Sequence, residues 1–168
     1  MSTAEGSVAT YLSNTANKYP ELLALVSGAQ SPTFEPLTFS ALDRKVNQAV
    51  EELTRAGFAK GHKTLLFVNP GPGLIIWAFA LFRIGAIPVV IDPGMGIRSF
   101  LSCIKRTQPE AMVGISRAFW ISRLLPGIFR SVYHRYLVGD GKFGNELPPN
   151  YQPIEVHNQA DELAAIVF

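Results

Sequence analysis

Residues 79–96, which read FALFRIGAIPVVIDPGMG, constrain the fold of this chain more than any other stretch. We expect an apolar helix to end at Gly85, because glycine readily adopts the left-handed conformation that closes a helix. The run 87–91 is apolar and rich in β-branched residues, which predicts a strand covered on both faces, as in a parallel sheet. Pro88 fits this strand if its missing N–H faces an edge or the start of the strand. The turn 92–96 then opens a second helix, so the stretch predicts part of a parallel α/β sheet.

The same alternation of strand and helix recurs along the chain without an internal sequence repeat. Helices are expected where apolar residues recur with the helical period, and strands where short apolar runs lie between turn residues. This order predicts a doubly wound, mainly parallel α/β sheet with helices on both faces. The expected helices cover 8–19, 40–56, 74–84, 97–108 and 118–125, and the expected strands cover 22–26, 64–68, 87–91, 111–115, 135–138 and the end of the chain.

The helix expected from Ser40 onward has one well-defined apolar face. Ser40 and Asp43, three positions apart, match a capping box, in which side chains satisfy the first free backbone N–H groups. On the polar face Glu51 and Arg55 are four residues apart and are expected to pair, and Gly57 is expected to end the helix. The apolar residues have the spacing of a single buried face: Leu42, Val46, Ala49, Val50, Leu53 and Ala56.

Three stretches resemble motifs of the adenylate-forming ligases, the family of acyl-CoA synthetases, luciferases and peptide-synthetase adenylation domains. Residues 79–96 resemble the second core motif, a helix end with a basic residue, Ile-Gly-Ala, a short apolar strand and Asp-Pro. Residues 37–58 resemble the first core motif, with a leucine, a Thr, an aromatic residue, a second leucine and a glycine-ended turn. Residues 161–168, DELAAIVF, resemble the strand that precedes the family's phosphate loop. The segment IDPGMG most resembles the corresponding segment in the branch that includes the olefin-pathway β-lactone synthetases and their fatty-acid-ligase relatives.

The resemblance implies the N-terminal part of such a ligase, inactive alone. We expect an α/β subdomain over residues 1–138, a surface loop or linker rich in Gly and Pro over 139–162, and a strand over 163–168 that leads towards a phosphate loop. Family members use ATP and Mg²⁺ to convert a carboxylate into an acyl-adenylate with release of pyrophosphate. The branch implies a long-chain or β-hydroxy fatty acid as the substrate, and the remaining subdomains of the ligase as partners.

The resemblance carries over no catalytic, cofactor-binding or metal-binding residue. The family's phosphate loop, aromatic-Gly-x-Thr-Glu motif, ribose-binding Asp and C-terminal Lys have no counterpart in this sequence, so neither ATP nor Mg²⁺ is expected to bind this chain alone. The motif positions Leu42, Gly85, Asp92 and Pro93 are expected to be architectural. The alternative is a stand-alone, non-catalytic binding module that has kept the fold, with a membrane surface as one partner. A weaker third option is an independent nucleotide-binding α/β domain.

Two turns at the ends of expected strands have both a structural and a functional interpretation. Residues 69–73, NPGPG, form a glycine-rich turn between a strand and a helix, the context of phosphate-binding loops. Each of the two prolines removes a backbone donor that a phosphate would need, so we favour a structural turn. Asp92 follows a buried strand, where α/β sheets often bind ligands. An Asp before Pro more often caps a turn, which is the interpretation we favour.

Other candidate site residues are isolated in the sequence. His62, His134 and His157 lie far apart with no Cys or carboxylate at ligand spacing, so a zinc site is not supported. Asp140 lies between two glycines but matches no complete calcium loop. Cys103 flanks an apolar helix face, which favours a packed thiol over a nucleophile.

Composition favours a single cytoplasmic domain. The one cysteine excludes an internal disulfide and is compatible with a reducing compartment. The first residues have neither the basic nor the apolar region of a signal peptide. The uncharged run 64–82 is interrupted by the NPGPG turn, so we do not expect a membrane span. Charged residues make up 17% of the chain, below the about 25% of typical domains, which predicts that part of the surface is normally covered.

Residues 97–136 concentrate positive charge, with seven basic residues against one acidic residue, Glu110, while the whole chain has a net charge of +2. We favour solvated helix faces with the interleaved aromatic residues in the core. Binding to an anionic membrane surface or an acyl carrier is the next interpretation, and nucleic acid is not expected. The basic residues are Arg98, Lys105, Arg106, Arg117, Arg123, Arg130 and Arg135, and the aromatic residues are Phe119, Trp120, Phe129, Tyr133 and Tyr136.

Overall fold

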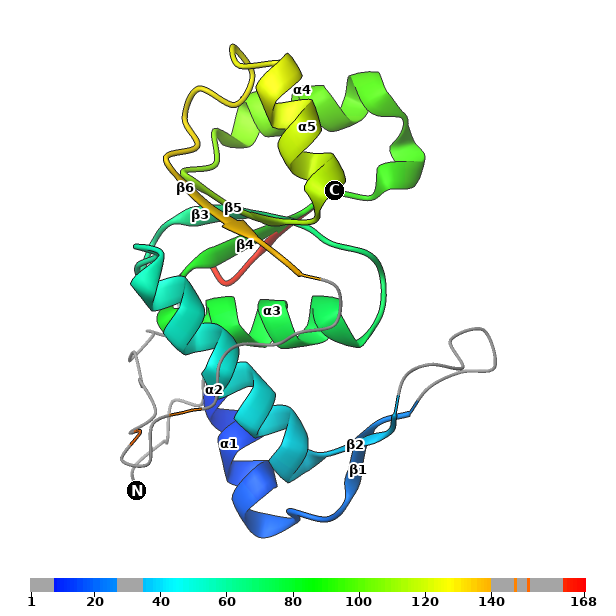
Figure 1. Ribbon diagram of the computed structural model, residues 1–168, viewed down its shortest axis with the longest axis vertical. Coiled ribbons are helices and arrows are strands. Elements are labelled where there is room, and N and C mark those ends of the chain that lie inside the picture. The colour runs from blue at the N-terminus through cyan, green and yellow to red at the C-terminus, as the bar shows by residue number, and fades with distance from the viewer. Residues whose placement is uncertain (1–7, 27–34, 140–146, 148–150, 152–161) are drawn as a thin grey trace.

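The computed structural model describes residues 8–26, 35–139, 147, 151 and 162–168 (Figure 1). Most of the linker expected over 139–162, with Asp140 and His157, lies outside the described residues, so that linker stays a prediction. The helices are α1 (Val8–Lys18), α2 (Phe39–Arg55), α3 (Pro72–Ile84), α4 (Ile97–Thr107) and α5 (Ser116–Leu124), with a 3-10 turn η1 (Pro93–Met95) before α4. The strands are β1 (Leu23–Leu25), β2 (Leu37–Thr38), β3 (Lys63–Phe67), β4 (Ile87–Val90), β5 (Ala111–Gly114), β6 (His134–Leu137) and β7 (Ile166–Val167).

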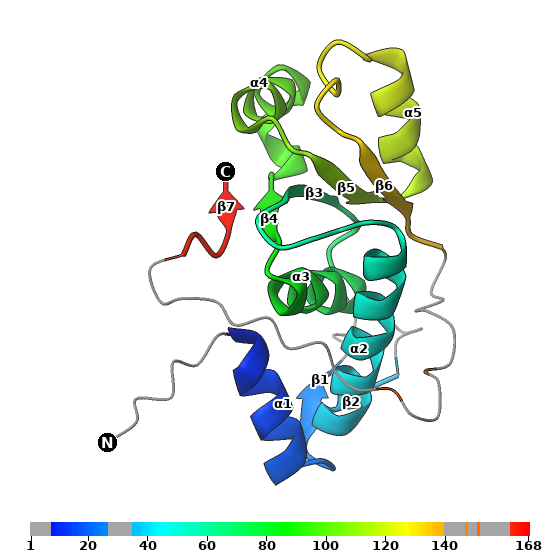
Figure 2. The same ribbon diagram turned by 90° about the vertical axis from the view of Figure 1, so that its left-hand side faces the viewer.

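The central sheet has five strands in the order β6–β5–β3–β4–β7, and each neighbouring pair runs parallel. β7 lies at one edge beside β4, at the opposite side of the sheet from β6 (Figure 2). It falls within the 163–168 stretch that was expected to form a strand. The prediction of a mainly parallel α/β sheet is confirmed.

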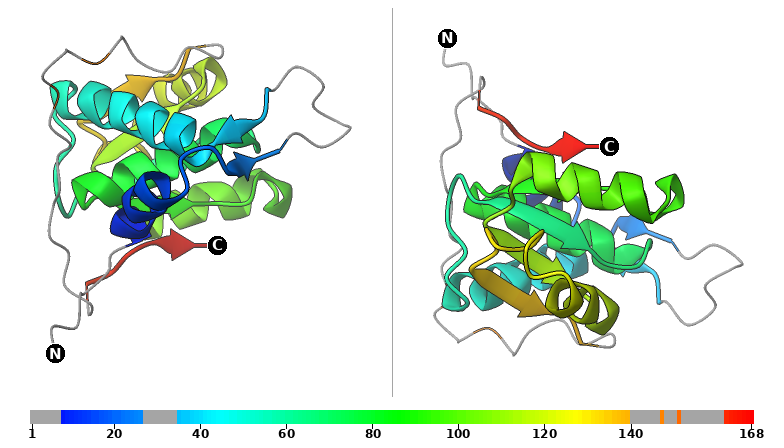
Figure 3. Two further views of the ribbon diagram at one scale, coloured as in Figure 1. Left: turned by 90° about the horizontal axis from the view of Figure 1, so that it is seen from below. Right: turned by 90° about the horizontal axis from the view of Figure 1, so that it is seen from above.

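Helices cover both faces of this sheet. In Figures 1 and 3, α4 and α5 lie on one face, while α3 and α2 lie on the other. Neighbouring residues of a strand point to opposite faces, and they accordingly join different cores. Leu66 packs in the core that contains Trp77 and Val46, whereas the adjacent Leu65 packs in the core that contains Ile104. Both faces of β3 are therefore buried, as the parallel-sheet pattern requires.

Pro88 lies where the sheet does not require its missing N–H. The Ile87 N–H donates to the His62 carbonyl on the β3 side, with an N···O distance of 2.9 Å. Because backbone groups alternate along a strand, the Pro88 nitrogen faces the β7 side, where pairing begins only at Val89. Pro88 therefore costs no ladder hydrogen bond, as expected.

The start of α2 differs from the prediction. The N-cap is Thr38, whose hydroxyl accepts a hydrogen bond from the Ala41 N–H at 3.2 Å, so the Ser40–Asp43 capping box is wrong. The helix begins at Phe39, one residue before the predicted start at Ser40, because an aromatic residue can occupy the first helical position. Other predictions for α2 are confirmed, since its apolar stripe from Leu42 to Leu53 is buried and the Arg55–Glu51 pair forms at 2.8 Å.

The strand expected over 22–26 is not part of the central sheet. β1 pairs antiparallel with β2 in a separate two-stranded sheet. The sequence reasoning missed β2 because its two residues, Leu37 and Thr38, are too few to give a strand signal.

A buried polar cluster joins the three helices on the α3 face. Arg83 of α3 is buried and donates hydrogen bonds to Asp43 of α2 at 2.8 Å, to Ser13 of α1 at 2.7 Å and to the Asn47 side-chain carbonyl. Asp43 also accepts from Asn47 at 3.1 Å and from Ser13 at 3.2 Å. The carboxylate of Asp43 therefore neutralises a buried guanidinium, which is the condition for burying a charge at tolerable cost.

Candidate functional site

The carboxyl edge of the sheet has the topology of a ligand-binding crevice. From β3 the chain passes through α3 on one face to β4, and from β5 it passes through α5 on the other face to β6 (Figure 1). The connections after these two adjacent strands lead in opposite directions along the sheet, which makes β3 and β5 the switch point. In open α/β sheets, ligands bind at this point, outside the carboxyl ends of the strands. The loop at residues 68–71 and the connection at residue 115 border the candidate site, and the turn at 91–96 lies beside it, after β4.

The loop after β3 is a structural turn. Pro72 is the first residue of α3, a position where its missing N–H is no loss. The Leu74 N–H donates to the Gly71 carbonyl at 3.1 Å, which directs this amide into the turn itself. These features support the structural interpretation of residues 69–73 over a phosphate loop.

The turn after β4 is organised by Asp92. One carboxylate oxygen accepts a hydrogen bond from the Gly94 N–H at 2.8 Å and caps η1, which agrees with the capping role favoured for this residue. The side chain is exposed at the carboxyl edge. The Asp92 N–H donates to the Phe168 carbonyl at 3.3 Å, and the Phe168 N–H donates to the Val90 carbonyl at 3.1 Å. The turn is thus fixed to the end of β7.

A close approach at the end of β5 was missed by the sequence reasoning. A Cβ atom on Gly114 would lie 2.9 Å from the Cβ of Ala118 in α5. Glycine therefore allows α5 to begin directly against the sheet, and a glycine inside a strand was the available signal. Beside it, the Phe67 carbonyl accepts from the Ile115 N–H at 3.1 Å, and the Phe67 and Phe100 rings pack with centroids 5.0 Å apart. The resulting wall of the site is apolar and close-packed.

Two of the histidines that are distant in the sequence meet in the structure. His62 and His134 stack with ring centroids 5.3 Å apart at the amino edge of the sheet. The His62 Nδ1 accepts from the Ala59 N–H at 3.3 Å. Within the described ranges, no three His, Cys, Asp or Glu side chains gather where they could hold a metal ion. The pair forms an aromatic contact at the amino edge of the sheet.

Tyr136 of β6 forms a hydrogen bond to α2, one of the helices that cover this face of the sheet. Its hydroxyl donates to the Glu52 carboxylate at 2.7 Å, and its ring packs against Trp77 at 5.0 Å. Burial, together with this hydrogen bond and the charge of Glu52, raises the pKa of Tyr136 well above its usual value. The raised pKa favours the neutral phenol, which keeps the hydroxyl proton available for the hydrogen bond to Glu52.

The basic segment 97–136 is only partly what the favoured interpretation predicted. All seven of its Lys and Arg side chains are exposed, and Phe129 is buried. Trp120 and Tyr133, however, are 68% and 72% exposed, and Leu124 is 75% exposed. The prediction that the aromatic residues belong to the core is therefore wrong for these two.

The remaining candidates have structural positions. Cys103 is buried, with its sulfur 4.0 Å from that of Met95, so the packed-thiol prediction agrees with the structure. No helix in the described part of the chain is both long and apolar enough to cross a membrane.

Comparison with known proteins identifies the architecture. A family model described as AMP-binding enzyme matches residues 12–168. The chain is 36% identical over 89 residues to an olefin β-lactone synthetase of Stenotrophomonas maltophilia, a match covering 53% of this chain and 16% of the relative. It is 34% identical over 85 residues to a salicyl-AMP ligase of Mycobacterium tuberculosis, covering 51% and 15%. A crystal structure of a long-chain-fatty-acid-CoA ligase from Archaeoglobus fulgidus superposes with a TM-score of 0.80 at 18% identity, over 99% of this chain and 35% of that chain.

Proposed function

This chain belongs to the AMP-binding enzyme family, and we propose that it contributes to a ligase that uses ATP to convert a fatty acid into an acyl-adenylate. The observation that carries the proposal is the family match, which extends over residues 12–168. The chain corresponds to the N-terminal part of an adenylate-forming enzyme and spans about a third of the solved ligase described above. The activity of a whole ligase is therefore part of the proposal.

The reaction would proceed by attack of a substrate carboxylate oxygen on the α-phosphorus of ATP. The bond from that phosphorus to the pyrophosphate oxygen breaks, which gives an acyl-adenylate and pyrophosphate. Such a transfer needs preorganised donors around the phosphates and a metal ion. The described residues supply no cluster of metal ligands, so we assign no magnesium ligand and no chemical step to this chain.

The contribution of this chain would be architectural. β7 ends at the carboxyl edge of the sheet, where Phe168 is hydrogen-bonded to the Asp92 turn and to Val90. The strand that resembles it in the family leads directly into a phosphate loop. We propose that β4, β7 and the Asp92 turn together set the position from which such a loop approaches the nucleotide.

The proposed substrate is a long-chain or β-hydroxy fatty acid. The olefin β-lactone synthetase and the long-chain-fatty-acid-CoA ligase support this choice, while the salicyl-AMP ligase indicates the competing class, an aromatic acid. A cytoplasmic setting, predicted from the single cysteine, belongs to the same proposal.

The test measures pyrophosphate release by the complete product of the gene that encodes this sequence. Long-chain, β-hydroxy and aromatic acids are supplied in parallel with ATP. We expect release with a fatty acid, and no release or ATP binding by the 168-residue chain alone. Preference for an aromatic acid would overturn the substrate class, and pyrophosphate release by the chain alone would overturn its architectural role.

A second candidate function, contact with an anionic membrane surface, rests on the exposed face of α5. Trp120 and Leu124 lie one helical turn apart and are both exposed, with exposed Arg117 and Arg123 on the same helix. Apolar side chains flanked by basic ones are the pattern of interfacial helices. Co-sedimentation with phosphatidylcholine vesicles containing phosphatidylserine should fall for Trp120→Ser with Leu124→Ser. Unchanged co-sedimentation would remove this candidate.

A further inference from the structure

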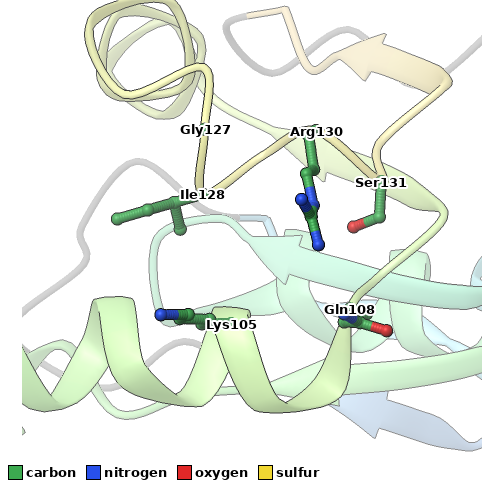
Figure 4. A pocket seen from close by; sticks show the side chains of 6 residues that line it. All are labelled: Lys105, Gln108, Gly127, Ile128, Arg130 and Ser131. Carbon is green, nitrogen blue, oxygen red and sulfur yellow. The ribbon is translucent and has the colours of Figure 1, made fainter.

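A hollow of about 420 Å³ lies at the amino edge of the sheet, opposite the Asp92 turn. It opens between the last turn of α4 and the loop that leads into β6 (Figure 4). Its volume is within the range of small-molecule sites, roughly 300–1,000 Å³. The lining residues are Lys105, Gln108, Gly127, Ile128, Arg130 and Ser131.

The charged side chains that line this hollow are all positive. Lys105 lies on the α4 wall, and Arg130 lies on the opposite wall with its guanidinium pointing towards α4 (Figure 4). None of the described residues that line the hollow is acidic. Among the described residues, neither Lys105 nor Arg130 forms an ion pair. Glu110, the one acid of the segment, is directed elsewhere, since its carboxylate accepts from the Lys63 N–H at 3.0 Å.

The hollow also contains neutral donors. The Ser131 hydroxyl lies on the same side as the Arg130 guanidinium, and the Gln108 amide closes the end of α4 (Figure 4). Within the described part of the chain, the backbone N–H groups of Arg130 and Ser131 have no acceptor. Cations and neutral donors that line one hollow together are the groups that bind phosphate in proteins.

The carboxyl end of α4 gives a competing explanation for Lys105, because basic residues in the last turn of a helix offset its dipole. That explanation applies equally to Arg106, which is in the same turn but points its guanidinium over the Phe168 ring at 5.9 Å. Arg130 is not part of α4, since it reaches the hollow from the loop before β6. The dipole of α4 therefore accounts for at most one of the two cations in the hollow.

We propose that this hollow is a binding site for a phosphate group, with Lys105 and Arg130 as the two charged ligands and Ser131 and Gln108 as neutral donors. The group can be carried by a soluble phosphate monoester or by the headgroup of an anionic lipid, which share the chemistry that the site recognises. The site lies at the opposite edge of the sheet from the proposed adenylation site, and it does not depend on the proposed function.

The first experiment is a titration of the ¹⁵N-labelled 168-residue chain with inorganic phosphate, followed by backbone amide shifts at constant ionic strength. We expect saturable shifts at the residues that line the hollow, with a dissociation constant in the millimolar range because both cations are exposed. Lys105→Gln and Arg130→Gln should each weaken binding about tenfold, the effect of losing one charge-assisted hydrogen bond. Exposed side chains tolerate such changes, and unchanged spectra elsewhere verify the fold.

Arg106→Gln and Arg123→Gln are the matched controls, because each removes one exposed positive charge from the same segment without touching the hollow. Both should bind phosphate as the parent chain does. Equal weakening by either control would overturn the proposal, because binding would then follow net charge alone.

A second arm separates the two sources of phosphate. Phosphatidylcholine vesicles with and without phosphatidic acid are tested for co-sedimentation. Binding that depends on phosphatidic acid and is lost in Lys105→Gln, but kept in Trp120→Ser, assigns the site to a lipid headgroup. Response to inorganic phosphate without vesicle binding assigns it to a soluble ester. Failure of the chain to respond to either probe overturns the site.

Discussion

Replacing Arg83 with Met should destabilise the chain more than any charge removal at its surface. The substitution keeps an unbranched apolar stem and removes the guanidinium of a side chain that is 3% exposed. It deletes hydrogen bonds to Asp43, Ser13 and Asn47. Among the described residues, the Asp43 carboxylate, whose side chain is 21% exposed, would then retain two neutral donors, Ser13 and Asn47.

The expected loss of stability depends on the Asp43 carboxylate, which stays in place without its cationic partner. Removing one partner of a buried ion pair costs about 3–5 kcal/mol, since the other charge stays without compensation. Asp43 keeps two hydrogen bonds and some contact with water, so we expect the lower end, about 3 kcal/mol. Adding Asp43→Asn to Arg83→Met should recover part of this loss, because no uncompensated charge would then remain.

The assay is urea unfolding at pH 7, followed by tryptophan fluorescence. Arg55→Met is the matched control, because Arg55 pairs with Glu51 at the same 2.8 Å but is 56% exposed. Exposed pairs of this kind contribute about 0.3–0.5 kcal/mol. If Arg83→Met costs no more than Arg55→Met, the buried cluster does not stabilise the packing of α1, α2 and α3, and the reasoning fails.

Three further predictions concern single side chains. Thr38→Ala should cost about 1 kcal/mol through loss of the α2 cap, whereas Ser40→Ala should be nearly neutral; the reverse order in urea unfolding would restore the capping box. Gly57→Ala and Gly61→Ala both place alanine at a φ near +85°, which costs about 1 kcal/mol. Gly57→Ala also adds a Cβ 2.8 Å from the His134 ring, so it should cost about 1–3 kcal/mol more than Gly61→Ala. Equal melting temperatures of the two variants would refute this clash. Tyr136→Phe should cost about 1–3 kcal/mol at pH 7 through loss of its hydrogen bond to a carboxylate. Because the folded pKa of Tyr136 is raised, its contribution is complete below the unfolded pKa of about 10 and falls as pH rises above it, so the variant should lose less stability than the parent chain in alkaline melts.

Features that depend on local chemistry were predictable from the sequence. The αL conformation of Gly85, the cap formed by Asp92 and the position of Pro88 each follow from one residue and its immediate neighbours. The two-sided burial of β3 and β4 follows from their apolar composition. Asp92 is the one of these residues at the carboxyl edge, whereas Gly85 and Pro88 lie at the start of β4, so the predictable part of the candidate site is the Asp92 turn.

The role of Asp43 was not predictable, because two partners competed for the same carboxylate. Its spacing from Ser40 indicated a local cap, whereas its ligand in the structure is Arg83, forty residues away. A buried guanidinium needs a carboxylate more than a helix end does, because Thr38 can cap α2 without charge. The sequence could not indicate this competition, since Arg83 lies in a helix whose apolar composition gives no sign of a polar partner.

The amino edge of the sheet was unpredictable for a different reason, which is register. Thr64, Ala111 and His134 are aligned across β3, β5 and β6, and this alignment brings His134 to His62. The same register brings the loop before β6 to the end of α4, which creates the hollow between Arg130 and Lys105. A shift of two residues in β6 would preserve its pattern of burial and its hydrophobicity, yet it would separate both pairs. The sequence pattern indicates which face of a strand is buried, but it does not indicate which residues of neighbouring strands lie opposite one another. The contacts at a sheet edge depend on this register, and so does the proposed phosphate site.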